Sequence, residues 1–156
     1  MAVELRDARL VAVIGPSEAS AEELEQAEEV GALLAEAHFW VLTGGLGGVM
    51  EAASRGAKSR RGHTVGLLPG TEPADANGWV DLALPTGLGE LRNGLLARAA
   101  IGVIAVGQGH GTLTEIGFAL GSGRPVLGVA TWAVHGVTQV DTASEAVEGL
   151  ARLLSQ

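Results

Sequence analysis

Two glycine-rich turns constrain the fold of this chain more than any other feature of its sequence. The first, Gly44–Gly48, reads GGLGG, and the second, Gly107–Thr112, reads GQGHGT. Each follows a short apolar run and precedes a segment whose apolar residues recur at helical spacing. Glycine at such a place lets the backbone turn sharply from a strand into a helix. A strand, a glycine turn and a helix in that order are typical of proteins built on a parallel sheet.

Short apolar runs, typical of strands that are buried on both faces, alternate with helical patterns along the chain. We therefore predict a single α/β domain over residues 1–156, a doubly wound Rossmann-like fold with a mostly parallel sheet and helices on both faces. Such sheets bind ligands where the strand order reverses, and we expect Leu10–Gly15 and Ile101–Val106 to flank that point. The other expected strands are Phe39–Thr43, Thr64–Leu68, Trp79–Leu84 (more exposed, near an edge) and Pro125–Val129.

The expected helices are marked by two capping boxes, in which Ser or Thr is followed three residues later by Glu. These boxes are Ser20 with Glu23 and Thr142 with Glu145. The helices are expected from the first box to about Ala37, from the first glycine turn to about Ala57, over Glu90–Ala99, from Thr112 to about Leu120, and from the second box onward with Val147, Leu150 and Leu154 inward.

Charge and composition exclude several classes of protein. The 156 residues carry a formal net charge of −8 and include no cysteine. The sequence shows no basic face for a nucleic acid, and it has no thiol for disulfides or zinc. No apolar run reaches the roughly 20 residues that span a bilayer, and the first nine residues, with Glu4 and Asp7, lack the pattern of a signal peptide. We expect a cytoplasmic protein with no nucleic-acid or membrane partner.

The remaining basic and imidazole side chains have simple interpretations. One basic cluster follows a predicted helix, where cations complement the negative end of the helix dipole. The histidines show no metal-ligand spacing, so we predict no metal site. The cluster is Arg55, Lys58, Arg60 and Arg61, and the histidines are His38, His63, His110 and His135.

The two glycine turns are candidate phosphate sites. The first N–H groups of a helix have no partner within the helix, and together with the helix dipole they attract anions. Neither turn has the sequence of a P-loop, and the first strand ends in Gly15-Pro16-Ser17 instead of G-x-G-x-x-G. We therefore predict a phosphorylated ligand, most simply a nucleotide, with NAD or FAD chemistry as a less favoured alternative.

Three segments resemble motifs of the LOG family, long labelled lysine decarboxylase-like. Thr43–Met50 (TGGLGGVM), leading to Gly56-Ala57, is similar to the first motif of that family. Gly107–Glu115 (GQGHGTLTE) is similar to the second, usually written PGGxGTxxE, and Leu88–Asn93 (LGELRN) to the segment that supplies the family's arginine. The resemblance covers nearly the whole chain. Within the family, the chain resembles the short branch that contains the molybdenum-cofactor carrier protein, through Pro85–Gly89 before Arg92-Asn93 and Ala76-Asn77 before Trp79.

The resemblance implies a reaction and a set of site residues. LOG enzymes split a nucleoside 5′-monophosphate into a free base and ribose 5-phosphate, and their functional arginine and glutamate correspond here to Arg92 and Glu115. A carboxylate can stabilise the oxocarbenium-like state of such a cleavage while a guanidinium holds the substrate. The resemblance also implies a homodimer or higher homo-oligomer and no required cofactor. The expected phosphate- or nucleotide-binding residues are Gly15, Gly44, Gly45, Gly47, Gly48, Met50, Asn93, Gly109, His110, Gly111 and Thr112.

Two interpretations of function stay open. The first is a nucleoside monophosphate hydrolase, and the second is a non-catalytic carrier or sensor of a phosphorylated ligand such as the molybdenum cofactor, a pterin. The LOG enzymes have Pro-Gly where this chain has Gly107-Gln108, and Arg-Lys where it has Arg92-Asn93; both departures favour the carrier. Thr112 and Glu115 also have the spacing of a capping box, and on the first turn of a helix the dipole favours an ionised Glu115 carboxylate.

Overall fold

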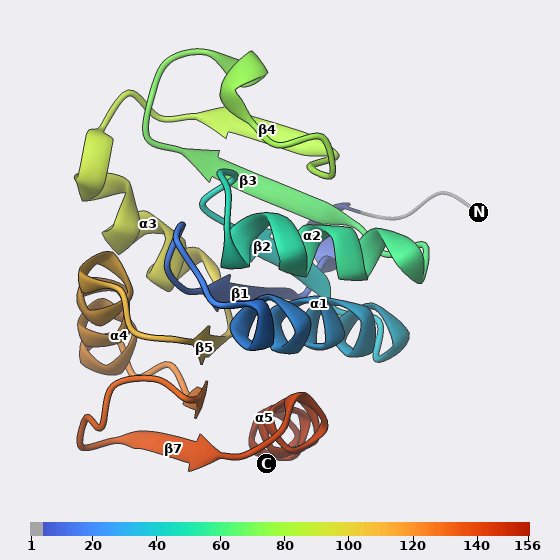
Figure 1. Cartoon of the computed structure of the whole chain (residues 1–156), viewed down its shortest axis with the longest axis vertical. Coiled ribbons are helices and arrows are strands. Elements are labelled where there is room, and N and C mark those ends of the chain that lie inside the picture. Colours follow the sequence, from blue (N-terminus) through green and yellow to red (C-terminus); the bar gives the residue numbers. More distant parts are fainter. Residues whose placement is uncertain (1–4) are drawn as a thin grey trace.

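The computed structural model describes residues 5–156, so Glu4 lies outside the described residues. These residues form a seven-stranded sheet of order β4-β3-β2-β1-β5-β6-β7, in which all neighbouring strands are parallel (Figure 1). The predicted doubly wound fold is confirmed, and the sheet is entirely rather than mostly parallel. The strands are β1 (Leu10–Ile14), β2 (Trp40–Thr43), β3 (Thr64–Leu68), β4 (Leu82–Pro85), β5 (Gly102–Val106), β6 (Val126–Val129) and β7 (Val137–Val140).

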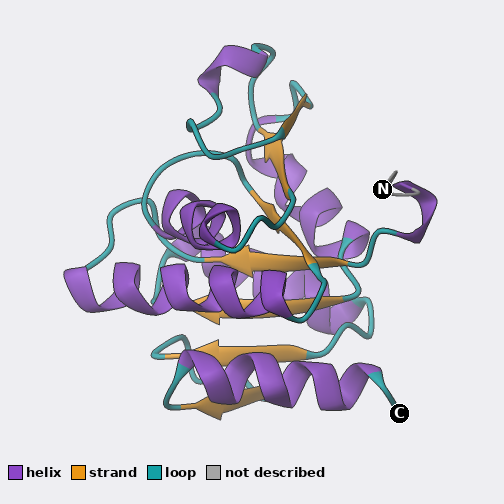
Figure 2. Ribbon diagram, turned by 90° about the vertical axis from the view of Figure 1, so that its right-hand side faces the viewer, coloured by secondary structure: helices purple, strands orange, loops and turns teal. Residues whose placement is uncertain are grey.

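Helices cover both faces of this sheet (Figure 2). In β1, Val11 and Val13 pack against the layer of α1, α2 and α5, while Ala12 and Ile14 pack against α3 and α4. Burial on both faces explains why the central strands are continuous apolar runs. The α-helices are α1 (Ala21–Glu36), α2 (Val49–Ser59), α3 (Arg92–Ala99), α4 (His110–Gly121) and α5 (Ala143–Leu154), and the 3-10 helices are η1 (Leu5–Asp7), η2 (Pro73–Asp75) and η3 (Gly89–Leu91).

The strand order reverses between β1 and β5, as predicted. β1 leads into α1 on one face and β5 leads into α4 on the other, so the two connections diverge beyond the carboxyl ends of these strands. Because all strands are parallel, the glycine turns that follow β2 and β5 lie at the same edge of the sheet. The topology therefore places both turns beside the crevice where ligands bind in such folds.

Both predicted capping boxes form their first hydrogen bond. Ser20 Oγ accepts from the N–H of Glu23 at 3.1 Å, and Thr142 Oγ1 accepts from the N–H of Glu145 at 3.1 Å. The C-terminal helix also packs as predicted: Val147 and Leu150 are buried in the core, and Leu154 packs against its edge. Local capping and apolar spacing thus determine where α1 and α5 begin and which face they bury.

Several predicted elements differ from the structure. The edge strand β7, Val137–Val140, was not predicted, because its four residues are partly polar and none is fully buried. The predicted strand Trp79–Leu84 is shifted: Trp79 lies in a turn, and β4 spans Leu82–Pro85. The predicted helix Glu90–Ala99 begins as the 3-10 helix η3 and becomes α-helical at Arg92.

The basic cluster around the end of α2 is mostly paired with carboxylates. Arg55 contacts Glu28 at 3.1 Å, Lys58 contacts Asp81 at 2.9 Å, and Arg60 contacts Glu36 at 2.7 Å. These partly exposed pairs agree with a solvated helix end rather than a binding face. Within residues 5–156, no helix is long and apolar enough to cross a membrane.

Candidate functional site

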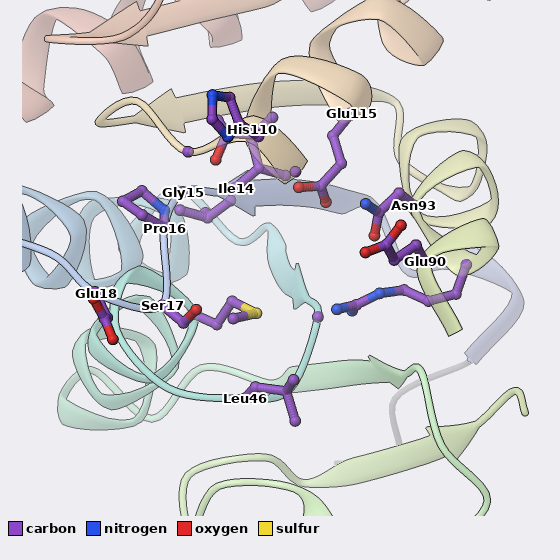
Figure 3. A pocket seen from close by; sticks show the side chains of 17 residues that line it. Ile14, Gly15, Pro16, Ser17, Glu18, Leu46, Glu90, Asn93, His110 and Glu115 are labelled. Carbon is purple, nitrogen blue, oxygen red and sulfur yellow. The ribbon is translucent and has the colours of Figure 1, made fainter. Parts of the chain in front are cut away.

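A cavity of about 470 Å³ opens at the switch point, beyond the carboxyl ends of β1, β2 and β5 (Figure 3). Four segments that are distant in sequence meet here: the turn after β1, the first glycine turn with the start of α2, the start of α3, and the start of α4. Its volume lies in the range of small-molecule and nucleotide sites. The lining residues are Val13, Ile14, Gly15, Pro16, Ser17, Glu18, Gly44, Leu46, Met50, Glu90, Arg92, Asn93, Gly109, His110, Gly111, Thr112 and Glu115.

Most of the residues predicted from the sequence meet in this cavity. Arg92 and Glu115, the expected functional pair, both line the cavity, together with expected ligand-binding residues from all four segments. Three glycines of the first turn, Gly45, Gly47 and Gly48, are not among the lining residues. Gly48 has instead a backbone role, since its φ of +64° is strained for any residue with a side chain, and a Cβ there would collide with the carbonyls of Pro16 and Ser17.

The two helices that begin at the glycine turns differ at their N-termini: the first N–H of α2, at Val49, donates to the carbonyl of Pro16 at 3.1 Å, whereas the first N–H groups of α4 are open. The N-cap residues of α2 and α4 are Gly48 and Gly109, which offer no side-chain cap, whereas α1 and α5 are capped by Ser20 and Thr142. No hydrogen bond within residues 5–156 engages the N–H groups of the first α4 residues, His110–Thr112. Unpaired donors and the positive end of the helix dipole therefore meet at the cavity wall, which is the arrangement that binds phosphate.

Gly44 and Arg92 form one unit of the site. A Cβ on Gly44 would collide with Nη1 of Arg92, so the glycine makes room for the guanidinium. Arg92 is only 8% exposed, and its Nη1 donates to the carbonyl of Leu67 at 2.6 Å. Its Nε is buried and has no partner within the described chain. Burial lowers the pKa of Arg92, and the charge of Glu115 opposes this shift.

Glu115 projects its carboxylate into the cavity from α4 (Figure 3). Burial raises its pKa to about 7, and the positive charge of Arg92 only partly offsets this effect. The expectation that Glu115 lies on the first turn of its helix is wrong. Because α4 begins at His110, Glu115 lies on its second turn, where the dipole is weaker and desolvation of the carboxylate dominates.

Thr112 does not cap α4, because the helix begins two residues earlier than predicted and its N-cap is Gly109. The Thr112 side chain is 2% exposed, and its Oγ1 has no hydrogen-bond partner in the described chain. The capping box proposed for Thr112 and Glu115 is therefore absent from the hydrogen bonds of residues 5–156. A buried hydroxyl without a partner is costly in a protein interior, which favours a ligand or water nearby.

Several residues that line the cavity were not predicted from the sequence. Pro16, Ser17 and Glu18 follow β1 directly at the switch point, and the predicted topology alone could have indicated them. Glu90 lies beside Arg92 in sequence and points to the same side of the cavity as Asn93 (Figure 3). Leu46 gave no signal, because an apolar residue between glycines has no distinctive chemistry.

The cavity combines two kinds of chemistry. Backbone donors of α4 form one part of its wall, and the side chains of Arg92, Asn93 and Glu115 form another. The first part suits a phosphate, and the second suits a sugar or a heterocycle with hydrogen-bonding groups. Among the described residues, no group of His, Cys, Asp or Glu is arranged to hold a metal ion.

Comparison with known proteins shows the family. The model of the SLOG cluster4 family matches residues 8–153. The chain belongs to the SLOG cluster4 family. The SLOG superfamily includes LOG-like proteins, so the resemblance deduced from the motifs is confirmed.

Its relatives cover nearly the whole domain. An uncharacterized protein of Archaeoglobus fulgidus is 38% identical over 138 residues, which cover 88% of this chain and 91% of that protein. The molybdenum cofactor binding protein of the phototrophic bacterium Rippkaea orientalis is similar in structure, with a TM-score of 0.89, 32% identity, and coverage of 94% of this chain and 98% of that one. The molybdenum cofactor carrier protein of Chlamydomonas reinhardtii gives a TM-score of 0.88, 31% identity, and coverage of 96% and 99%.

Proposed function

We propose that the cavity binds a phosphorylated small molecule, a nucleotide or a pterin cofactor, with its phosphate on the N-terminus of α4. The open N-terminus of α4 carries this proposal: it begins with glycine, has no side-chain cap, and presents unpaired N–H groups to a cavity of about 470 Å³. Because the chain carries a net charge of −8, local backbone donors and Arg92 have to supply the attraction for the anion.

Hydrolysis of a nucleoside 5′-monophosphate is the first candidate activity. A carboxylate whose pKa is about 7 is suited to accept or release a proton at neutral pH, and Glu115 lies in the same cavity as Arg92. In this reaction, ionised Glu115 stabilises the oxocarbenium-like sugar or activates water, and Arg92 holds the ribose phosphate or the departing base. The glycosidic bond breaks, the hydroxyl of water adds at the sugar carbon, the remaining proton of that water goes to the departing base, and free base and ribose 5-phosphate leave.

Carriage of a phosphorylated pterin is the second candidate. Its support is the similarity of nearly the whole chain to the molybdenum cofactor binding and carrier proteins, at 31–32% identity. Asn93 lines the cavity where the LOG enzymes have a lysine, which lowers the positive charge available for catalysis. A carrier needs the phosphate site and the cavity but no functional carboxylate.

Incubation with a panel of nucleoside 5′-monophosphates separates the two candidates. The hydrolase releases free base and ribose 5-phosphate, which chromatography detects, and it acts poorly on the matching nucleosides because phosphate binding orients the reacting bond. Absence of base release from every nucleotide, together with retained binding of a phosphorylated ligand, would favour the carrier. Binding of nucleosides and nucleotides with equal affinity would contradict the phosphate site itself.

We also propose that the protein forms a homodimer through the surface of η3, α3 and α4 beside the cavity. Leu91, the last residue of η3, is 75% exposed there, and Leu95 lies four residues further along, on α3. Contiguous exposed apolar side chains on a folded protein are typical of a contact surface. The large apolar side chains exposed on these three elements are Leu91, Leu95, Leu113 and Phe118.

A further inference from the structure

The segment between β6 and β7 is bonded to the second glycine turn. Thr131 Oγ1 donates to the carbonyl of Gly107 at 2.7 Å, and Trp132 Nε1 donates to the carbonyl of Gly109 at 2.9 Å. Thr131 is 6% exposed, so the first of these bonds is shielded from water. The segment is held in turn by β7, because Gln139 Nε2 donates to the carbonyl of Trp132 at 2.8 Å.

Gln108 belongs to this contact and not to the cavity. Its side chain is exposed, is absent from the lining residues, and directs its amide to the carbonyl of Thr131 at 3.4 Å. Gln108, which stands where the LOG motif has the first glycine of Pro-Gly-Gly, therefore faces the β6–β7 segment. Side chains of both the turn and the segment take part in joining them.

The bond from Trp132 acts on the residue that begins α4. The Gly109 carbonyl accepts both the Leu113 N–H, at 3.1 Å, and the Trp132 indole N–H. In a trans peptide group the N–H points opposite to the carbonyl, so the N–H of His110 points away from Trp132. Gly109 and His110 both line the cavity. Because the Gly109 carbonyl and the His110 N–H belong to one peptide group, a bond that holds the carbonyl also holds the His110 N–H on the cavity side.

The same tryptophan supports the His110 ring. The centroids of the two rings are 6.1 Å apart, and their planes are inclined by 19°, an offset stack. His110 lines the cavity and Trp132 does not. Trp132 thus lies behind a wall of the site and supports both the backbone and the side chain of His110.

We propose that Trp132 and Thr131 are positioning residues that hold the second glycine turn and the first donor of α4 in the geometry that binds the ligand's phosphate. This inference rests on the proposed function, since it assumes that the ligand's phosphate binds at the N-terminus of α4. Donors held in place before binding lose little freedom when the ligand arrives, so their support raises affinity without any contact to the ligand.

Paired substitutions test this role. Trp132→Phe keeps a ring against His110 and removes the indole N–H, and Thr131→Val removes the hydroxyl while keeping the shape of the side chain. With AMP and GMP as probes, calorimetric titration should show binding weakened about fivefold to tenfold in each variant, the effect of one lost hydrogen bond. Thr131→Ser, which keeps the hydroxyl, and Trp79→Phe, at an exposed site outside the cavity lining, should stay within about twofold of wild type.

Hydrogen exchange of the unliganded protein gives a readout that does not depend on the ligand. Amides of residues 107–113 should exchange faster in Trp132→Phe and Thr131→Val but not in the two controls. Unchanged exchange would overturn the inference, and so would faster exchange with unchanged affinity. If the wild-type protein binds neither nucleotide, the proposed function fails for these ligands, and the exchange of residues 107–113 alone decides whether Trp132 and Thr131 hold the turn.

Discussion

At the scale of single residues, the protonation of Glu115 connects the structure to both stability and reaction. Its pKa of about 7 results from burial that outweighs the attraction of Arg92. From pH 4.5 to pH 7 the unfolded chain has released this proton while the folded chain keeps it, so raising the pH favours unfolding. The free energy of unfolding therefore falls across this range, by up to about 3 kcal/mol, and levels off above pH 7.

Substitution of Glu115 by Gln should remove this pH dependence. Glutamine resembles the protonated glutamate and has no charge to bury, so the variant should be as stable as wild type at pH 5 and more stable at pH 8. Urea unfolding at these two pH values measures the difference. A stability difference that is the same at both pH values would mean that the Glu115 carboxylate titrates near its ordinary pKa.

The same substitution tests the role of Glu115 in the proposed hydrolysis. Glu115→Gln should lower turnover of a nucleoside monophosphate by on the order of 10²–10⁴ while nucleotide affinity stays close to that of wild type. In the wild-type protein, turnover should rise with pH around 7 as the carboxylate ionises. Arg92→Ala should weaken both affinity and turnover, because in the proposed reaction the guanidinium holds the substrate in the ground state and in the transition state. Turnover of Glu115→Gln equal to wild type would leave the carboxylate without a catalytic role.

At the scale of elements, the start of α4 is the part of the site that can be altered with the least disturbance to the fold. A Cβ on Gly111 meets only the Asn93 amide, at 3.8 Å, and a Cβ on Gly117 in the same helix meets nothing within 4 Å. Gly111→Val should abolish binding of phosphorylated ligands, since its side chain occupies the approach to the helix N-terminus, whereas Gly117→Val should bind normally. Calorimetric titration with AMP and with GMP compares the two. Equal affinity in both variants would mean that the glycines at the start of α4 form a turn and do not serve phosphate binding.

The elements that the sequence predicts are those whose residues carry a strong local signal. The five strands that lie between the two edge strands are apolar on both faces; they are β1, β2, β3, β5 and β6. The helices α1 and α5 begin with capping boxes. β7 has no such signal, because its pattern Val-Thr-Gln-Val is equally typical of an exposed loop. The start of α4 was misplaced for a related reason, since a capping pattern at Thr112 is visible in the sequence and a glycine N-cap is not.

At the scale of the whole molecule, topology explains why the site could be located from the sequence. Parallel strands bring their carboxyl ends to one edge, so two glycine turns 63 residues apart in sequence, at Gly44 and Gly107, predict one shared site. What the sequence cannot show is contact between segments. The fit of Arg92 against Gly44, the support of Gly109 by Trp132, and the burial of Glu115 depend on tertiary packing alone.

The proposed homodimer is a property of the whole molecule, and its mass in solution tests it. Light scattering at micromolar concentration should give twice the chain mass of 15.8 kDa. Leu91→Lys combined with Leu95→Lys places charge on the proposed contact surface and should shift the mass to that of the monomer. The matched control is Leu153→Lys on α5, where the side chain is about as exposed as that of Leu95 but lies in the opposite helix layer, and it should leave the mass unchanged. A wild-type protein of 15.8 kDa in solution would contradict the dimer.

Native mass spectrometry of the purified protein tests the phosphate-binding cavity most directly. The wild-type protein should carry one small molecule per chain, and fragmentation of that molecule should release phosphate. The Gly117→Val variant should carry the same molecule, and the Gly111→Val variant should carry none. A bound molecule without phosphate, or one that Gly111→Val retains at the wild-type level, would contradict the assignment of the α4 N-terminus as the phosphate site.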